Sequence, residues 1–180
     1  MPIRFPLSIR RSAVAVVVGC CLHGAPALAD DACDGFRAEF ASTRTQYAGD
    51  AQTLQAGSDV ESAPTVMPGR PYALALSPLS GVTLAAAPGK PMLPDGAAGG
   101  MVRFEVPEAG GYHVAIGSNH WIDIVDSGTL IASRDFQGVF GCSAPHKVVV
   151  YELPAGRELV LQFSGSPTDA TRLLIKAATP

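Results

Sequence analysis

Beyond residue 29, three histidines could by residue type bind a metal ion or act as general bases: His113, His120 and His146. A β-scaffold normally presents metal-binding imidazoles at spacings such as His-x-His or His-x-x-x-Glu. Neither spacing occurs here. His120 and Asp123 stand three positions apart, which puts their side chains on opposite faces of an extended strand. The pattern therefore predicts ordinary rim or surface histidines, and no metal ion is expected.

Hydrolytic chemistry has no complete motif in this sequence. There is no G-x-S-x-G turn, and Ser164 lies in Phe-Ser-Gly-Ser, which is typical of a strand end. Cys142 and His146 could form a thiolate–imidazole pair only if Cys142 were free. Asp123 and Asp126 are the best-placed carboxylates for glycoside hydrolysis, which stays open because the two acids can come from distant strands. No glycine-rich phosphate loop joins a strand to a helix, so no cofactor is expected.

A binding function has one positive indication, around Trp121, the only tryptophan. An exposed indole beside the hydrogen-bonding side chains of Asn119, His120 and Asp123 could stack on a sugar ring while its neighbours bind hydroxyl groups. The alternative is that Trp121 anchors the protein core, because large aromatic residues in β-proteins are usually buried. The ligand-binding hypothesis requires Trp121 to be at least partly exposed.

The first 29 residues have the pattern of an export signal. Three arginines precede an apolar run, Ser12–Leu22, that is too short to span a bilayer comfortably. Ala27-Leu28-Ala29 is a small-x-small cleavage site, so the mature chain is expected to begin at Asp30 and to reside in the periplasm or outside the cell. A second route stays open, because Val17-Val18-Gly19-Cys20 resembles a lipobox in which Cys20 would carry a lipid anchor.

The mature chain is predicted to be a single acidic domain. Removing the leader leaves 151 residues, which is the usual size of one domain. The leader contains three of the 13 Lys and Arg residues and none of the 16 acidic ones, so the net charge becomes −6. Nucleic acids and anionic membrane surfaces need clustered basic residues, so neither is an expected partner. No membrane span is expected after the leader.

Cleavage after Ala29 leaves two cysteines, Cys33 and Cys142. In an oxidising compartment two such cysteines most simply form one disulfide. The rival interpretation makes them free thiols or metal ligands, but no CxxC motif supports it.

Ahead of the strands, residues 30–71 are predicted to hold one short helix and an irregular connection. Within residues 31–48, Phe36, Phe40 and Tyr47 recur at helical spacing and would pack on a sheet, whereas Thr43 occupies a position where an apolar residue would be expected. Residues 49–71 are polar and rich in Gly and Pro, which predicts a surface connection without regular structure.

Residues 72–180 are predicted to form an antiparallel β-sandwich, jelly-roll-like, of about nine strands. Alternation places Val102, Phe104 and Val106 on one face, and Tyr112, Val114 and Ile116 on one face of the next strand. Residues 88–100 and 135–146 are expected to be loops, and Asp126-Ser127-Gly128 a hairpin turn. The predicted strands are Tyr72–Leu76, Val82–Ala86, Met101–Val106, Tyr112–Gly117, Trp121–Val125, Thr129–Arg134, Lys147–Leu153, Glu158–Ser164 and Thr171–Ala177.

The carboxy-terminal half also resembles a family. The segments GGYHVAIGSNHWIDIV, GCSAPHK and VVVYELPAGRELVLQFSGS are similar to those of small exported proteobacterial proteins of unassigned function, which implies a β-sandwich. Some such sequences carry a homogentisate 1,2-dioxygenase label. That enzyme is larger and cytosolic, with a two-His, one-carboxylate iron site that has no counterpart here, so its activity is not implied. Relatives have an additional histidine where this chain reads RDFQGVFG.

Together these patterns predict an exported, non-catalytic binding or accessory module, with Asn119, His120, Trp121 and Asp123 as the candidate ligand-binding residues. A small molecule, a carbohydrate or an envelope protein is the expected partner. The alternative is an envelope metal-dependent enzyme that uses these histidines with Asp123 or Asp135. Convergence of two imidazoles and a carboxylate would favour the enzyme.

Overall fold

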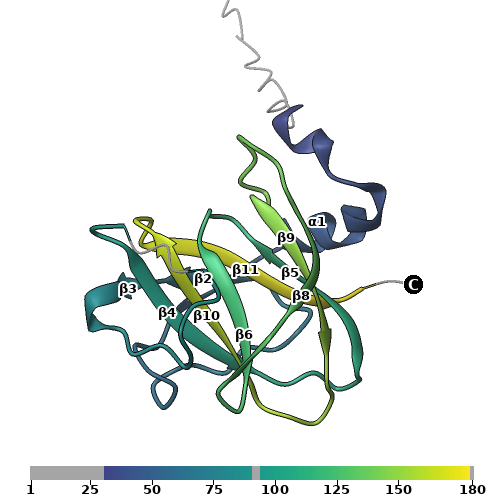
Figure 1. Ribbon diagram of the computed structural model, residues 1–180. Coiled ribbons are helices and arrows are strands. Elements are labelled where there is room, and N and C mark those ends of the chain that lie inside the picture. Colours follow the sequence, from purple (N-terminus) through teal and green to yellow (C-terminus); the bar gives the residue numbers. More distant parts are fainter. Residues whose placement is uncertain (1–30, 91–93, 179–180) are drawn as a thin grey trace, which may run out of the picture.

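The computed structural model describes residues 31–90 and 94–178, which form two β-sheets packed face to face (Figure 1). The predicted leader over residues 1–29 and the alternative lipid attachment at Cys20 lie outside the described residues. Sheet A contains, in spatial order, β1 (Gln52–Gln55), β2 (Tyr72–Ala75), β11 (Ala170–Ala177), β5 (Gly110–Ile116), β9 (Lys147–Leu153) and β8 (Ser133–Gly138). Sheet B contains β3 (Ser77–Pro78), β4 (Ala98–Phe104), β10 (Leu159–Ser166), β6 (Trp121–Asp126) and β7 (Thr129–Ile131).

The strand pairing is that of a jelly roll. In chain order, β2, β4, β5 and β6 pair antiparallel with β11, β10, β9 and β7 respectively, which is a long hairpin wrapped around a barrel axis. Consecutive strands of the chain cross between the sheets, except for the pairs β1–β2, β3–β4, β6–β7 and β8–β9, whose members are neighbours in one sheet. The predicted antiparallel sandwich is confirmed, and one parallel pair, β1 with β2, is added at the edge of sheet A.

The interior of the sandwich follows the two-residue alternation of its strands. Val102, Phe104 and Val106 all lie in the central core, as do Tyr112, Val114 and Ile116. From β6, Ile122 and Ile124 join them. Because successive side chains of a strand point to opposite faces, one apolar residue in two is enough to fill the space between the sheets.

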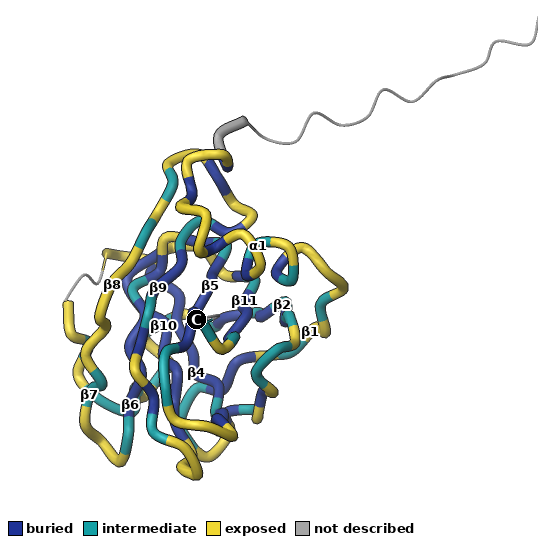
Figure 2. The backbone as a smooth tube through the Cα atoms, turned by 90° about the vertical axis from the view of Figure 1, so that its right-hand side faces the viewer, coloured by how far each residue is buried: buried dark blue, intermediate teal, exposed yellow. Residues whose placement is uncertain are grey.

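Further segments cover the outer faces, which explains why so many outward residues are also buried (Figure 2). The amino-terminal segment packs Cys33, Phe36, Phe40 and Tyr47 on sheet A. Two segments, one around residues 60–63 before β2 and one around residues 82–86 after β3, lie over sheet B, where their apolar side chains meet Met101, Val125 and Val160. Each sheet is therefore shielded from water on both faces over much of its area.

The amino-terminal segment is helical only in short pieces. The expected helix over residues 31–48 is divided into the 3-10 helices η1 (Asp31–Gly35) and η2 (Ala38–Phe40) and the α-helix α1 (Ala41–Tyr47). The break comes at Arg37, whose backbone is extended (φ −59°, ψ 148°) and whose N–H donates to Gln137 of β8. Thr43 is buried because its hydroxyl bonds to His113, so tertiary contacts override the helical pattern here.

Eleven strands are present among the described residues, where about nine were predicted. Residues 52–55 and 77–78 form the extra strands β1 and β3, and the expected strand Val82–Ala86 is irregular after the 3-10 helix η3 (Leu79–Gly81). The single strand expected over Thr129–Arg134 is divided at Ala132, where the chain leaves sheet B for sheet A and continues as β8. Part of the predicted loop 135–146 is therefore a strand.

Glycines explain why β4 begins earlier than expected. Ala98–Gly100, assigned to a loop from their composition, are in β4. A Cβ on Gly100 would lie 2.7 Å from the Cβ of Ala56, and one on Gly99 would lie 2.6 Å from the carbonyl oxygen of Phe163. These glycines therefore permit close approach of neighbouring backbone rather than marking a turn.

Two local predictions are confirmed. Asp126 pairs with Thr129 across a two-residue turn in which Ser127 and Gly128 have φ values of 50° and 81°, as a type I′ hairpin requires. Cys33 and Cys142 form a disulfide with a Cα–Cα distance of 5.0 Å.

Within residues 31–90 and 94–178, no helix is long and apolar enough to cross a bilayer.

Candidate ligand-binding pocket

A pocket of about 450 Å³ opens where the edges of the two sheets meet, between β6 and β7 of sheet B and β8 and β9 of sheet A. It exists because β7 is short and pairs only with Ile124, Val125 and Asp126. On this side, no strand of the described residues pairs with the first half of β6. The walls include Trp121, Ile122, Ile131, Phe136, Val149 and Tyr151, so the lining is mainly apolar, as in most small-molecule sites.

Side chains from β9 satisfy the backbone of this free edge. The Lys147 ammonium donates to the carbonyl oxygen of His120, and the Tyr151 hydroxyl donates to that of Ile122 at 3.1 Å. Burial raises the pKa of Tyr151, so the hydroxyl remains a donor. The two contacts join β9 of sheet A to the first part of β6 and the residue before it.

Trp121 is half-buried and its indole is fixed by Asp123. The indole Nε1 donates to Asp123 Oδ1 at 2.8 Å. Asp123, which is 7% exposed, also accepts from the Gly89 N–H and the Gln162 amide, both at 3.3 Å. Because three donors hold this carboxylate, its main effect is to set the orientation of the tryptophan. Lys90 lies 5.7 Å from the centre of the indole ring, within cation–π range.

Lys147 is the basic side chain of the pocket wall. It forms no ion pair with a carboxylate in the part of the chain that the structure describes. Burial lowers the pKa of Lys147 to about 8, and the charge of Lys90 adds to this effect.

His120 faces the interior and not the pocket. Its side chain is 0% exposed, with Nδ1 2.7 Å from Ser118 Oγ and the ring edge-on to Phe163. Its Nε2 has no hydrogen-bond partner within the described residues. Burial, helped by the Lys147 charge, lowers the pKa of His120 to about 4. His120 therefore does not line the pocket, and its imidazole stays neutral at pH 7.

Asn119 also lies away from the pocket, since its Oδ1 accepts a hydrogen bond from Ser166 Oγ at 2.6 Å. Of the four residues predicted to bind a ligand, Trp121 and Asp123 line the pocket and Asn119 and His120 do not. The same alternation that separates His120 from Asp123 also separates it from Trp121.

The other two histidines lie in different places. His113 is on the outer face of sheet A, with Nδ1 2.8 Å from Thr43 Oγ1 and its ring against Phe40. His146 Nδ1 lies 3.3 Å from the carbonyl oxygen of Cys142. Across residues 31–90 and 94–178, no group of three or more His, Cys, Asp or Glu side chains is placed to hold a metal ion. The histidine convergence that would favour the enzyme hypothesis is therefore not observed among these residues.

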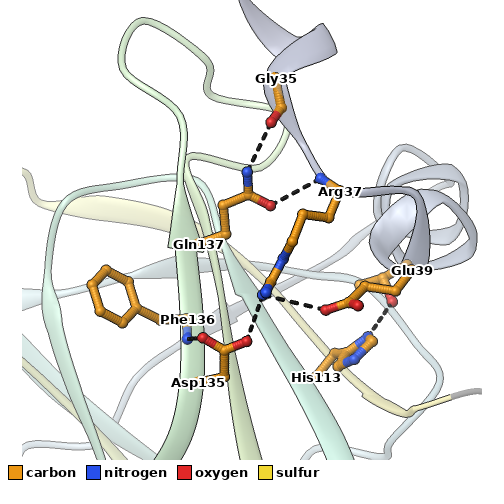
Figure 3. Close-up of polar contacts among 8 residues, drawn as sticks. Gly35, Arg37, Glu39, His113, Asp135, Phe136 and Gln137 are labelled. Atoms are coloured by element: carbon orange, nitrogen blue, oxygen red, sulfur yellow. Dashed lines mark hydrogen bonds and ion pairs between the residues drawn. The ribbon is translucent and has the colours of Figure 1, made fainter.

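The amino-terminal segment holds β8 in place as one wall of the pocket. Arg37 pairs with Asp135 at 2.6 Å and lowers the pKa of that carboxyl, and the Gln137 amide donates to Gly35 at 2.7 Å. Figure 3 shows that Phe136 points away from these contacts. This side chain lines the mouth of the pocket and is 69% exposed.

Sequence reasoning missed Lys147, Tyr151 and Phe136. After Lys147, the run Val148-Val149-Val150-Tyr151 is apolar on both strand faces, so its alternation could not indicate which face lines a cavity. Phe136 stood in a predicted loop, although its neighbours Asp135 and Gln137 alternate with it in polarity as an edge strand would.

Comparison with models of protein families finds none that matches this chain. Comparison with curated proteins finds no match either.

Proposed function

We propose that this protein is an exported, non-catalytic binding module whose pocket between β6, β7, β8 and β9 takes a small, mainly apolar molecule. The observation that carries the proposal is the preformed, mainly apolar pocket of about 450 Å³ with Trp121 fixed in its wall by Asp123. Ligand sites of small molecules typically have volumes of about 300–1,000 Å³ and a few fixed polar groups. A prearranged aromatic wall reduces the entropy lost on binding.

The hydrogen bonding and burial of the polar side chains near the pocket support a binding role better than catalysis. Asp123 is engaged by three donors, and the His120 imidazole is turned into the core. A carbohydrate ligand has less support than an apolar one, because Trp121 Nε1 and Asp123 bond to each other and Asn119 lies elsewhere. Few lining groups then remain to bind sugar hydroxyls.

Export to the periplasm or beyond is supported by the disulfide between Cys33 and Cys142, since such bonds persist in oxidising compartments. The leader-like residues 1–29 point the same way. Lipid attachment at Cys20 remains the alternative form of export and leaves the pocket hypothesis unchanged.

Filling the pocket is expected to abolish binding of a neutral apolar probe. Ala132 is exposed and lines the pocket, so Ala132→Phe would place a ring in its mouth without disturbing the core. We expect N-phenyl-1-naphthylamine to bind the wild type and to bind this variant at least about tenfold more weakly, a loss of about 1.4 kcal/mol. The probe's emission and energy transfer from Trp121 measure binding, because Trp121 is the only tryptophan.

Ala155→Phe is the matched control, since Ala155 is exposed in the β9–β10 turn and does not line the pocket. It should bind the probe like the wild type. Equal binding by both variants, or probe binding without energy transfer from Trp121, would place the ligand elsewhere and contradict the proposal. Thermal unfolding of each variant checks that the fold is retained.

A further inference from the structure

Lys147 brings a positive charge into an apolar wall. Its neighbours in the pocket include Ile122, Val149 and Tyr151, and its ammonium donates to the His120 carbonyl oxygen. Burial of a charge is unfavourable unless an opposite charge compensates it. No described carboxylate forms an ion pair with Lys147, so the protein leaves this charge uncompensated.

Asp123 does not form an ion pair that compensates the Lys147 charge, although it lines the same pocket. Its two oxygens accept hydrogen bonds from Trp121, Gly89 and Gln162. Lys90, which lies over the indole, adds a second positive charge close enough to affect Lys147. The described charged groups at this end of the pocket are therefore the ammonium groups of Lys147 and Lys90 and the Asp123 carboxylate, whose oxygens already accept three hydrogen bonds.

From this arrangement we infer that the ligand is a monocarboxylate with an apolar body, whose carboxylate pairs with Lys147 Nζ while its body lies against Trp121, Ile131 and Phe136. This inference rests on the proposed binding function and names the ligand class for the same pocket. A charge-assisted hydrogen bond to the carboxylate would compensate the ammonium. The apolar walls would exclude water from the pair and strengthen it.

Octanoate and octanol test this inference, because they share a chain length and differ in charge. In the wild type at pH 7, octanoate is expected to bind at least about tenfold more tightly than octanol. In Lys147→Met this preference should disappear, and in Lys147→Arg it should persist. Trp121 fluorescence and titration calorimetry provide independent measurements of the two affinities.

Lys176→Met is the matched control. Lys176 also donates one hydrogen bond through Nζ, at 2.9 Å to Ser42, and it does not line the pocket. The variant removes the same charge and should retain the wild-type preference for octanoate. If both methionine variants lose the preference equally, net charge and not Lys147 would be responsible, and the inference would be wrong.

The pH dependence gives a second readout. Octanoate affinity is expected to fall as the pH rises through about 8, because the anion binds the protonated amine, whereas octanol affinity should not change. The other titratable groups at this end are Lys90, His120, Asp123 and Tyr151. The pKa of His120 is about 4 and the pKa of Tyr151 is raised, so neither group should change its charge near pH 8. Lys90→Met tests the remaining lysine, and octanoate affinity should still fall with rising pH in that variant.

The outcomes separate this inference from the proposed function. If N-phenyl-1-naphthylamine binds in the pocket but the wild type does not prefer octanoate to octanol, the inference is wrong and the binding function stands. If the neutral probe does not bind in the pocket, the binding function itself is contradicted. A preference for octanoate that survives Lys147→Met would also overturn the assignment of the carboxylate to this lysine.

Discussion

Removing the disulfide is expected to lower the free energy of unfolding by about 4 to 5 kcal/mol in the chain-entropy model. Cys33 and Cys142 are 109 positions apart and the bond is buried in the cluster that joins the amino-terminal segment to sheet A. The Cys33→Ser/Cys142→Ser variant, compared with the oxidised wild type by urea denaturation, measures the effect. A loss of this size is a large part of the stability of an ordinary domain.

The same variant should affect the pocket. Gly35 and Arg37 follow Cys33 and hold Gln137 and Asp135 of β8, so releasing the cysteine frees the segment that supports the wall carrying Phe136. We expect weaker probe binding together with the lower stability. Reductant should shift the wild-type denaturation midpoint and leave that of the double variant unchanged. A midpoint that reductant does not move in either protein would show that the bond contributes little.

Acidification is expected to destabilise the protein by about 3 kcal/mol between pH 7 and pH 4, through His120 alone. The pKa of His120 in the folded protein is about 4, well below the value of about 6.5 for an unfolded chain. The unfolded state therefore binds the proton first. Stability is fully present above pH 6.5 and is lost as the pH falls toward 4, because protonation would place a charge in the core beside Phe163 and near Lys147.

His120→Gln tests this prediction by removing the titrating group while keeping a polar side chain near Ser118. Its free energy of unfolding should change less between pH 7 and pH 4 than that of the wild type. His113 also has a lowered pKa because of burial, so some dependence on pH should remain. His146→Gln serves as the control, because His146 is only partly buried. Parallel stability curves for the wild type and His120→Gln would contradict the assignment.

The amino-acid pattern alone was sufficient to predict the class of fold and the disulfide. Alternation placed Val102, Phe104 and Val106 in the core, and a strand has only two faces, so a clear alternation leaves one choice. Asp126-Ser127-Gly128 predicted its hairpin because few residues accept the positive φ values of that turn. The two cysteines beyond residue 29 allow one pairing with each other, and that disulfide is observed.

The pocket was decided by tertiary structure, since it depends on which segments meet. The sequence predicts that the neighbours of Trp121 bind the ligand with it, but the side chains of Asn119 and His120 do not line the pocket. Lys147 and Tyr151 of β9 line it instead. The crossing at Ala132, which divides one expected strand between two sheets, opens the space. Nothing local encodes that crossing, because it follows from how the two sheets pack and from how few residues β7 retains to pair with β6.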